Sequence, residues 1–266
     1  MNRFEAPAKE RSLAGRTGSG RAAIQDNLER LRSAQKPARG TAAYSRYVNR
    51  PLGRQVAALA HRLGISPNQA TVVSATLSAC GIALIALRPP DVLSAVLVPV
   101  LLAFGYVMDS VDGQLARLRG QGSAAGEWLD HTVDLVKTLC LHLAVLISWY
   151  RWPPLEGSVV LLIPMGFLVV ATTTYFGLIL LPTLRRAAPA DPATLPPENP
   201  LRAWLLLPVD YGMVCWLFLL LASPTLFFAG YSAFGICAAL ALAAALRKWW
   251  RELRTQDRER AAVGVP

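Results

Sequence analysis

Long and nearly uncharged apolar blocks recur through most of this sequence, and they restrict its fold more than any other feature. A helix needs roughly 20 apolar residues to cross the hydrocarbon core of a bilayer, which is about 30 Å thick. We therefore predict an all-α, polytopic membrane protein with six transmembrane helices. The expected spans cover residues 70–87, 92–108, 126–149, 158–181, 204–221 and 225–246.

Composition and charge agree with a membrane protein. Hydrophobic residues make up 53% of the chain and charged residues 17%, which is too apolar for an ordinary soluble domain. The formal net charge of +10 would fit either nucleic acid or an anionic membrane surface as a partner. Because the basic residues flank the apolar blocks, we expect membrane lipids as partners and no nucleic acid.

The distribution of Lys and Arg predicts the orientation of the chain. Six spans place both termini on one side, and most of the 27 Lys and Arg residues fall in segments on that side. The opposite loops contain only Arg88 and Arg151. The positive-inside rule therefore places both termini in the cytoplasm. Because the Ala- and Arg-rich composition suggests a bacterium, we expect a multi-pass protein of the cell membrane, in a bacterial inner membrane.

An amphipathic helix is expected to precede the first span. Within residues 43–65, Leu52, Val56, Leu59 and Leu63 recur at helical spacing, and arginines occupy the other side. This pattern is typical of a helix that lies on the cytoplasmic interface of a membrane. A helix packed on a soluble partner is the alternative.

Four aspartates lie at the end of the second expected span and inside the third. Asp109 and Asp112 share one helix face, and Asp130 and Asp134 share another, because their spacings are three and four residues. The connection over residues 118–123 is short, so the two helices should pack antiparallel with the carboxylates facing each other. Ionisable side chains at membrane depth are costly and normally face a cavity or a partner.

Four bare carboxylates would repel one another, and a hard divalent cation would relieve that repulsion. Oxygen ligands favour Mg²⁺ or Mn²⁺, with Ca²⁺ as a further candidate. This many carboxylates suits two ions, an arrangement used for displacement at phosphorus. The alternative, buried aspartates paired with Arg117 and Lys137, leaves too many charges unmatched.

The residues between the aspartates suit a nucleotide. Gly113, Ala116 and Gly126 are small, which allows close helix approach or leaves room for a flat ligand. Arg117 follows Ala116, and its guanidinium could hold a phosphate.

The segment DSVDGQLARLRGQGSAAGEWLDHTVD, residues 109–134, carries a specific resemblance. It resembles the signature of the CDP-alcohol phosphotransferase (CDP-alcohol phosphatidyltransferase) family, D-x2-D-G-x2-A-R-x8-G-x3-D-x3-D, at every fixed position and every gap. The six-span layout, the amphipathic helix and the Pro67-Asn68…Thr71 start of the first span are also similar to that family.

The resemblance implies a membrane transferase of phospholipid biosynthesis. Such an enzyme moves a phosphoalcohol (phosphatidyl-type) group from a CDP-linked donor to an acceptor hydroxyl, and it releases CMP. It also implies a homodimer and a role for each matching residue: metal ligands Asp109, Asp112 and Asp130; CDP-site residues Asp112, Gly113, Ala116, Arg117 and Gly126; and Asp134 as a metal contact and the general base.

A second string, G-E-x-x-D-H-x-x-D, is similar to the form found in choline and ethanolamine phosphotransferases. It implies that His131 helps to deprotonate the acceptor, against the alternative of a histidine that only hydrogen-bonds near the site. Glu127, one turn earlier, could orient His131 or lie at the metal rim.

Other charged residues near the expected site allow two interpretations each. Lys137 could neutralise a carboxylate or bind an acceptor phosphate. For Arg185 and Arg186 we favour anchoring at the membrane surface over binding an acceptor phosphate. Asp210 could recognise an acceptor hydroxyl, or cap the backbone where Pro208 breaks it.

Two other functions are weighed against the transferase. A Mg²⁺-dependent membrane prenyltransferase would also bind a pyrophosphate donor through acidic clusters, but it has no reason to share the glycines, alanine and arginine of the signature. A small polytopic transporter would be expected to show inverted repeats or paired broken helices, which the sequence lacks. The donor alcohol and the acceptor stay open: a lipid donor such as CDP-diacylglycerol and a soluble CDP-alcohol are both candidates.

The expected organisation has four segments. Residues 1–42 form a flexible basic tail, and residues 43–65 the amphipathic cytoplasmic helix. Residues 66–248 form the six-helix catalytic domain, and residues 249–266 a basic cytoplasmic tail.

Overall fold

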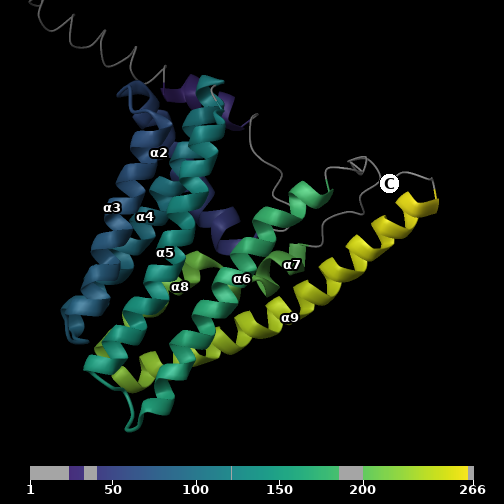
Figure 1. Ribbon diagram of the computed structural model, residues 1–266. Helices are drawn as coiled ribbons and strands as arrows, with labels where there is room; N and C mark the ends of the chain where they lie inside the picture. Colours follow the sequence, from purple (N-terminus) through teal and green to yellow (C-terminus); the bar gives the residue numbers. More distant parts are fainter. Residues whose placement is uncertain (1–23, 33–40, 121, 186–199, 263–266) are drawn as a thin grey trace, which may run out of the picture.

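The structure is a computed structural model that describes residues 24–32, 41–120, 122–185 and 200–262 (Figure 1). These residues form helices, turns and short connections, and no strand occurs among them. The predicted all-α class is therefore confirmed. Within the segment expected to be a flexible tail, residues 24–32 are helical, and Leu31 is fully buried in a cluster that includes Ala57 and Leu115. The rest of the tail before residue 41 lies outside the described residues.

The first long helical segment lies along α4 (Val92–Arg119). It begins with η1 (Ser45–Asn49), a single π-helical turn, and continues as α2 (Arg50–Arg62). The π turn directly precedes Pro51, whose nitrogen has no hydrogen to donate to a regular helical ladder. Gly64 follows the helix with φ 76°, a left-handed conformation that glycine readily adopts just after a helix C-terminus.

The α2 helix packs inward through a face of small residues that the sequence pattern did not predict. Leu52, Leu59 and Leu63 are exposed, as expected for the apolar side of an interfacial helix. A separate face of small, buried residues (Gly53, Ala57, Ala58 and Ala60) packs inward, and α2 makes many of its contacts with α4. A Cβ on Gly53 would lie 2.5 Å from Ser110 Oγ and 2.9 Å from Ser110 Cβ, so only glycine allows this approach.

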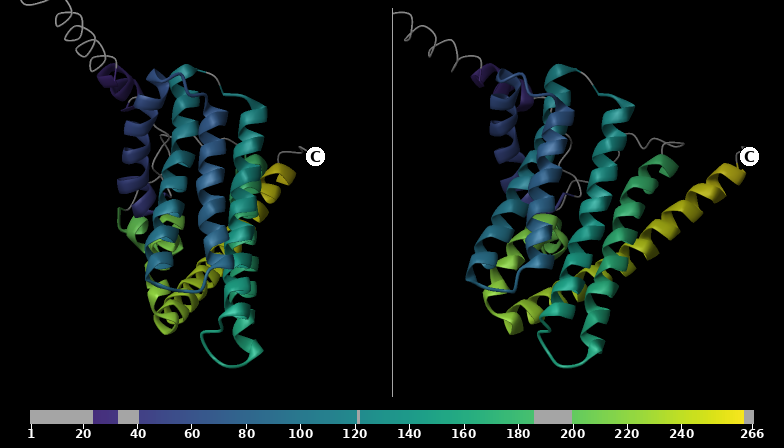
Figure 2. Two further views of the ribbon diagram at one scale, coloured as in Figure 1. Left: turned by 90° about the vertical axis from the view of Figure 1, so that its left-hand side faces the viewer. Right: turned by 60° about the vertical axis from the view of Figure 1, so that its left-hand side comes forward.

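Three long helices follow: α3 (Pro67–Leu87), α4 (Val92–Arg119) and α5 (Ala124–Arg151). A capping box begins α3: Gln69 N donates to Ser66 Oγ at 3.2 Å and Ser66 N donates to Gln69 Oε1 at 2.8 Å. Gly120, at φ 62°, ends α4. A short connection leads to α5, and α4 and α5 run antiparallel, as predicted (Figure 2). They do not pack closely on each other as expected, because α3 packs against both of them.

The chain then forms η2 (Ser158–Leu161) and α6 (Leu162–Arg185), and it ends with α9 (Pro224–Ala262), which is longer than predicted. The helix α9 continues beyond its apolar part through the basic residues that follow Leu246. Figure 1 shows α9 crossing the other helices obliquely, and α6 contacts it extensively. A core of large side chains, including Leu102, Trp149, Phe167, Phe218 and Tyr231, joins these helices.

The predicted fifth span, residues 204–221, is wrong as one continuous helix. The chain forms α7 (Pro200–Leu205), η4 (Leu207–Val209), α8 (Tyr211–Leu217) and η5 (Phe218–Ala222) instead. Pro208 cannot donate to a helical ladder, and the Asp210 side chain caps a new helix by accepting from Gly212 N at 3.0 Å. Both α8 and η5 pack against α4, so this broken segment is part of the helical core.

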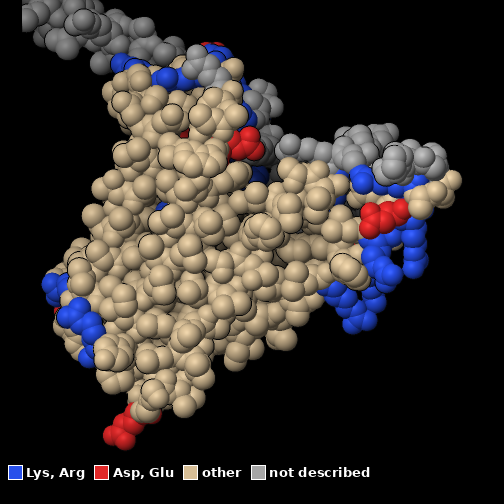
Figure 3. All heavy atoms as spheres, viewed as in Figure 1, with Lys and Arg blue, Asp and Glu red and all other residues tan. Residues whose placement is uncertain are grey.

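Five helices in the described part of the chain are long and apolar enough to cross a membrane, with mean hydropathies of 1.5–2.0. The segment Tyr211–Ala222 is apolar but shorter. On the face shown in Figure 3, Lys and Arg gather towards the ends of the helices, and the wide band between them is largely uncharged. The chain is therefore a multi-pass membrane protein.

Gly53→Ala should lower the free energy of unfolding by about 1–3 kcal/mol, because the added methyl group would push α2 away from Ser110. Thermal unfolding of the detergent-solubilised protein measures the change. Gly166→Ala is the matched control, since nothing lies within 4 Å of that Cβ position on α6 and alanine favours the helix. Equal melting temperatures for the two variants would contradict the tight α2–α4 contact.

Candidate metal and phosphate site

Three of the four aspartates come together between α4 and α5. One carboxylate oxygen from each of Asp109, Asp130 and Asp134 lies within 4.8 Å of the other two. Two helices of one antiparallel hairpin supply them, as the spacing predicts. Asp109 and Asp134 are largely buried, with 19% and 27% of their side chains exposed.

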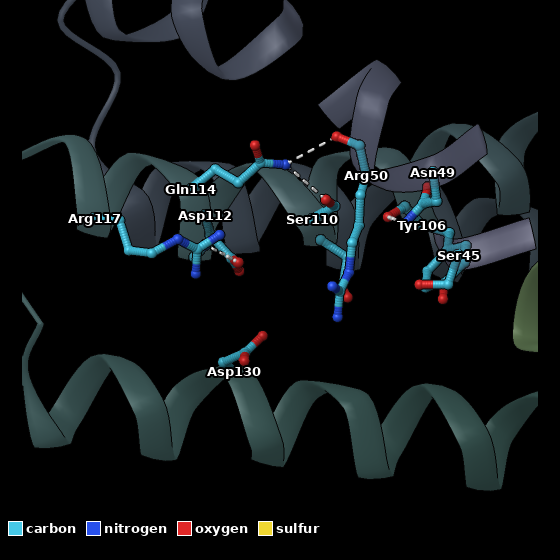
Figure 4. A pocket seen from close by; sticks show the side chains of 11 residues that line it. Ser45, Asn49, Arg50, Tyr106, Ser110, Asp112, Gln114, Arg117 and Asp130 are labelled. Carbon is cyan, nitrogen blue, oxygen red and sulfur yellow. Dashed lines mark hydrogen bonds between the residues drawn. The ribbon is translucent and has the colours of Figure 1, made fainter. Parts of the chain in front are cut away.

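Asp112 lies beside this group, on the side of α3. Its side chain is buried, with Thr71 Oγ1 donating to Oδ2 at 2.7 Å and Gly113 N donating to Oδ1 at 2.5 Å. Figure 4 shows Asp112 on one helix and Asp130 on the facing helix, on opposite sides of a cavity. The structure therefore brings all four predicted aspartates to one place, although Asp112 has separate hydrogen-bond partners.

The cavity has a volume of about 230 Å³, and both carboxylates and cationic side chains line it. Arg117 extends from α4 near Asp112, and Arg50 extends into the same space from the start of α2 (Figure 4). The buried Nε of Arg117 has no hydrogen-bond partner among the described residues. The lining residues are Ser45, Asn49, Arg50, Tyr106, Asp109, Ser110, Asp112, Gly113, Gln114, Arg117 and Asp130.

The π turn and the broken segment hold the other side of the cavity. Asn49 Nδ2 donates to the carbonyl of Tyr106 at 3.1 Å, and Ser45 N donates to Asp210 Oδ2 at 2.9 Å. Asp210 is buried and also caps α8. Of the two interpretations of Asp210, the structure supports capping of broken backbone. The same carboxylate ties η1 to α8.

Lys137 reaches the carboxylates from α5. Its ammonium lies 2.5 Å from Asp109 Oδ1, 2.7 Å from Asp134 Oδ1 and 3.3 Å from Ser74 Oγ. Of the two interpretations of Lys137, the structure supports neutralisation of carboxylates. At the far end of α6, Arg185 pairs with Glu252 of α9, while Arg186 lies outside the described residues.

Some predicted site residues do not line the cavity. His131 and Asp134 are absent from its lining, and so are Ala116 and Gly126. His131 is partly exposed, with Nε2 at 3.9 Å from Glu127 Oε1, and its carbonyl accepts from Tyr175 Oη at 2.7 Å.

Sequence patterns missed several residues of the site. Thr71 and Ser74 belong to α3, and Asn49 of η1 meets Tyr106 of α4, so each contact depends on packing between helices. Only the position of Thr71, shortly after the capping box, gave a signal, through its resemblance to the start of the family's first span.

The ligand atoms of the clustered side chains suit a hard divalent cation. The clustered groups are carboxylate oxygens, the ligand type that Mg²⁺ and Mn²⁺ prefer. Two of these residues, Asp109 and Asp130, line a cavity that arginine side chains also line. Buried carboxylates at this spacing repel one another unless cations lie among them. The residues present can therefore hold a metal together with a phosphate-bearing ligand.

Comparisons with known proteins agree with this geometry. The sequence profile of the CDP-alcohol phosphatidyltransferase family matches residues 64–246. An archaetidylinositol phosphate synthase from Pyrococcus horikoshii is 38% identical over 106 residues, which cover 40% of this chain and 53% of that protein. A phosphatidylinositol phosphate synthase from Corynebacterium glutamicum is 38% identical over 96 residues, which cover 36% of this chain and 41% of that protein. The matched stretches thus span about half the length of these curated relatives.

The fold also resembles a solved structure. The crystal structure of Mycobacterium tuberculosis phosphatidylinositol phosphate synthase with CDP-DAG bound superposes with a TM-score of 0.51 and 18% identity. The match covers 76% of this chain and 94% of that chain. At this identity the likeness shows a shared fold.

Thr71→Val should weaken Mn²⁺ binding by about 10–100-fold, because it removes the hydroxyl that orients Asp112 and keeps the side-chain shape. Isothermal titration calorimetry of the purified protein measures the affinity. Thr71→Ser keeps the donor and should bind Mn²⁺ nearly as well as the unmodified chain. An unchanged affinity in Thr71→Val would show that Asp112 needs no such support.

Proposed function

Since the chain belongs to the CDP-alcohol phosphatidyltransferase family, we propose that it is a membrane-embedded enzyme of phospholipid biosynthesis. It transfers a phosphatidyl-type phosphoalcohol group from a CDP-linked donor to an acceptor hydroxyl and releases CMP. One observation carries the proposal: the aspartates of two facing helices meet at a cavity that also contains Arg117 and Arg50. Family membership also argues against the prenyltransferase and the transporter.

The donor that we propose is a CDP-linked lipid. The structurally similar synthase binds CDP-DAG, and both curated relatives are named for inositol phosphate lipids. A soluble CDP-alcohol with a lipid acceptor is the second candidate, because of the G-E-x-x-D-H string. Acceptors to compare are inositol, inositol phosphate, glycerol phosphate, serine and diacylglycerol.

Asp109, Asp112, Asp130 and Asp134 are the proposed ligands of Mg²⁺ or Mn²⁺. Bound there, the cation would offset the charge of the donor pyrophosphate and make CMP a better leaving group. The number of ions predicted from the sequence, two, stays a prediction.

The other residues of the cavity bind and orient the donor in this proposal. Arg117 and Arg50 would hold phosphate oxygens, consistent with the unpartnered Nε of Arg117. Gly113 lines the cavity without a side chain that could exclude the nucleotide. Ala116 and Gly126, which the family resemblance places in the CDP site, would contact parts of the nucleotide that lie outside the cavity.

The transfer needs a base near the acceptor. In the proposed step the acceptor oxygen attacks the lipid-side phosphorus, the bond from that phosphorus to the oxygen of CMP breaks, and CMP leaves. Asp134 would take the hydroxyl proton, because it belongs to the carboxylate group between the helices. His131 lies one turn along α5 on the partly exposed side, and its predicted part in deprotonation stays a second hypothesis.

The location that we propose is the cell membrane of a bacterium, with both termini and the site on the cytoplasmic side. The exposed leucines of α2 support its predicted place on the membrane interface. A homodimer is the assembly expected from the family.

Asp112→Asn should lower the rate of CMP release at least about 100-fold, because it removes one charge from the proposed metal site. The purified protein is incubated with Mg²⁺, CDP-diacylglycerol and each acceptor in turn; CMP is measured, and mass spectrometry identifies the lipid product. Asp91→Asn is the matched control on the same helix, since asparagine also caps a helix and Asp91 lies at the opposite end of α4. Failure of the unmodified chain to release CMP from any CDP-alcohol would overturn the proposal.

Removal of divalent cations should abolish the reaction. Excess EDTA is expected to stop CMP release, and added Mg²⁺ or Mn²⁺ should restore it, since the carboxylates alone would repel the donor pyrophosphate. Full activity after extensive chelation would contradict the role given to the aspartates.

A further inference from the structure

Lys137 is a buried charged side chain of the site and has three polar partners on three helices. Its relative exposure is 8%. The ammonium contacts Ser74 of α3, Asp109 of α4 and Asp134 of α5, at the distances given above. A buried ammonium is strongly unfavourable unless it is paired and hydrogen-bonded, and here both conditions are met. The surrounding helices therefore hold the Lys137 ammonium in a fixed place within the site.

The ammonium occupies a place that a metal ion would otherwise need. Mg²⁺ lies about 2.1 Å from its oxygen ligands. The Lys137 nitrogen lies 2.5 Å and 2.7 Å from one oxygen of Asp109 and one of Asp134. An ion bound to the same two oxygens on the side where this nitrogen lies would nearly coincide with it, and two cations cannot share that position.

The cavity opens on the other side of the carboxylates. Asp109, Asp112 and Asp130 line it, and neither Asp134 nor Lys137 does. The carboxylate group therefore has one face towards the cavity, where a phosphate-bearing ligand would enter, and another face closed by the Lys137 ammonium.

We propose that the Lys137 ammonium takes the place of a second divalent ion, so that the chain without its donor binds one ion at the cavity face. Asp109, Asp112 and Asp130 hold that ion. The inference rests on the metal site of the proposed function, and it reduces the expected number of ions from two to one. Lys137 acts as a positioning residue: it fixes Asp109 and Asp134 and supplies one positive charge to a group of four carboxylates.

Counting bound Mn²⁺ tests this inference without any turnover. The full-length purified protein is stripped of metal and titrated with Mn²⁺ in detergent, and electron paramagnetic resonance measures the free and bound ion. The unmodified chain should bind one Mn²⁺ with the spectrum of an isolated ion. Lys137→Met keeps the length of the side chain without its charge and should bind two. Two ions about 3.5–4 Å apart would show spin–spin coupling.

Two control variants accompany the test. Lys248→Met removes a lysine of α9 that pairs with Glu252 at 3.5 Å and should leave the count at one. Lys137→Arg keeps the positive charge and should also bind one. Circular dichroism and gel filtration check that each variant is folded. If Lys137→Met fails to fold, the number of Mn²⁺ ions bound by the unmodified chain still tests the inference, because two ions would contradict it.

Three outcomes overturn the inference. Two coupled Mn²⁺ ions in the unmodified chain would show that Lys137 leaves room for both. One ion in a folded Lys137→Met would show that Lys137 does not block a second site. No bound Mn²⁺ in the unmodified chain would remove the metal site itself. One bound Mn²⁺ in a chain that releases no CMP would support the inference and overturn the proposed function.

Discussion

The arrangement of this protein depends on the electrostatic cost of holding four carboxylates between α4 and α5 within a largely apolar helical core. Carboxylates this close repel one another, and an apolar surrounding offers little screening. The structure balances part of that charge with the Lys137 ammonium and with Thr71, which donates to Asp112. Thr71 belongs to α3, and Ser74 of the same helix accepts from the Lys137 ammonium, so α3 has to lie beside the hairpin. The remaining charge faces a cavity and accounts for the affinity for cations that we propose.

Parts of the chain far apart in sequence meet around that cavity. The π turn before Pro51 directs Asn49 towards the carbonyl of Tyr106, and the backbone of Ser45 donates to Asp210 of the broken segment. The interruption at Pro208 thus positions the start of α2, from which Arg50 extends towards the carboxylates. A regular fifth helix would present no such cap to the π turn.

The sequence predicted what depends on short spacings and missed what depends on packing. Asp109, Asp112, Asp130 and Asp134 lie on two successive helices joined by a short turn, so their meeting could be inferred. The partners of Lys137 include Ser74, 63 residues away, and no local pattern chooses between its two interpretations. Averaged hydropathy predicted one continuous span over residues 204–221, because Pro208 and Asp210 lie among apolar neighbours, although a break at Pro208 was one interpretation of Asp210. Small residues on α2 formed a packing face that the leucine pattern did not reveal.

The central claim is that α4 and α5 bring these carboxylates together to bind a divalent cation. Anomalous diffraction from crystals grown with Mn²⁺, collected on both sides of the manganese absorption edge, tests it most directly. We expect a manganese peak between the two helices, in contact with oxygens of Asp109, Asp112 and Asp130. A map with these side chains ordered, and with no manganese among them at saturating Mn²⁺, would contradict it.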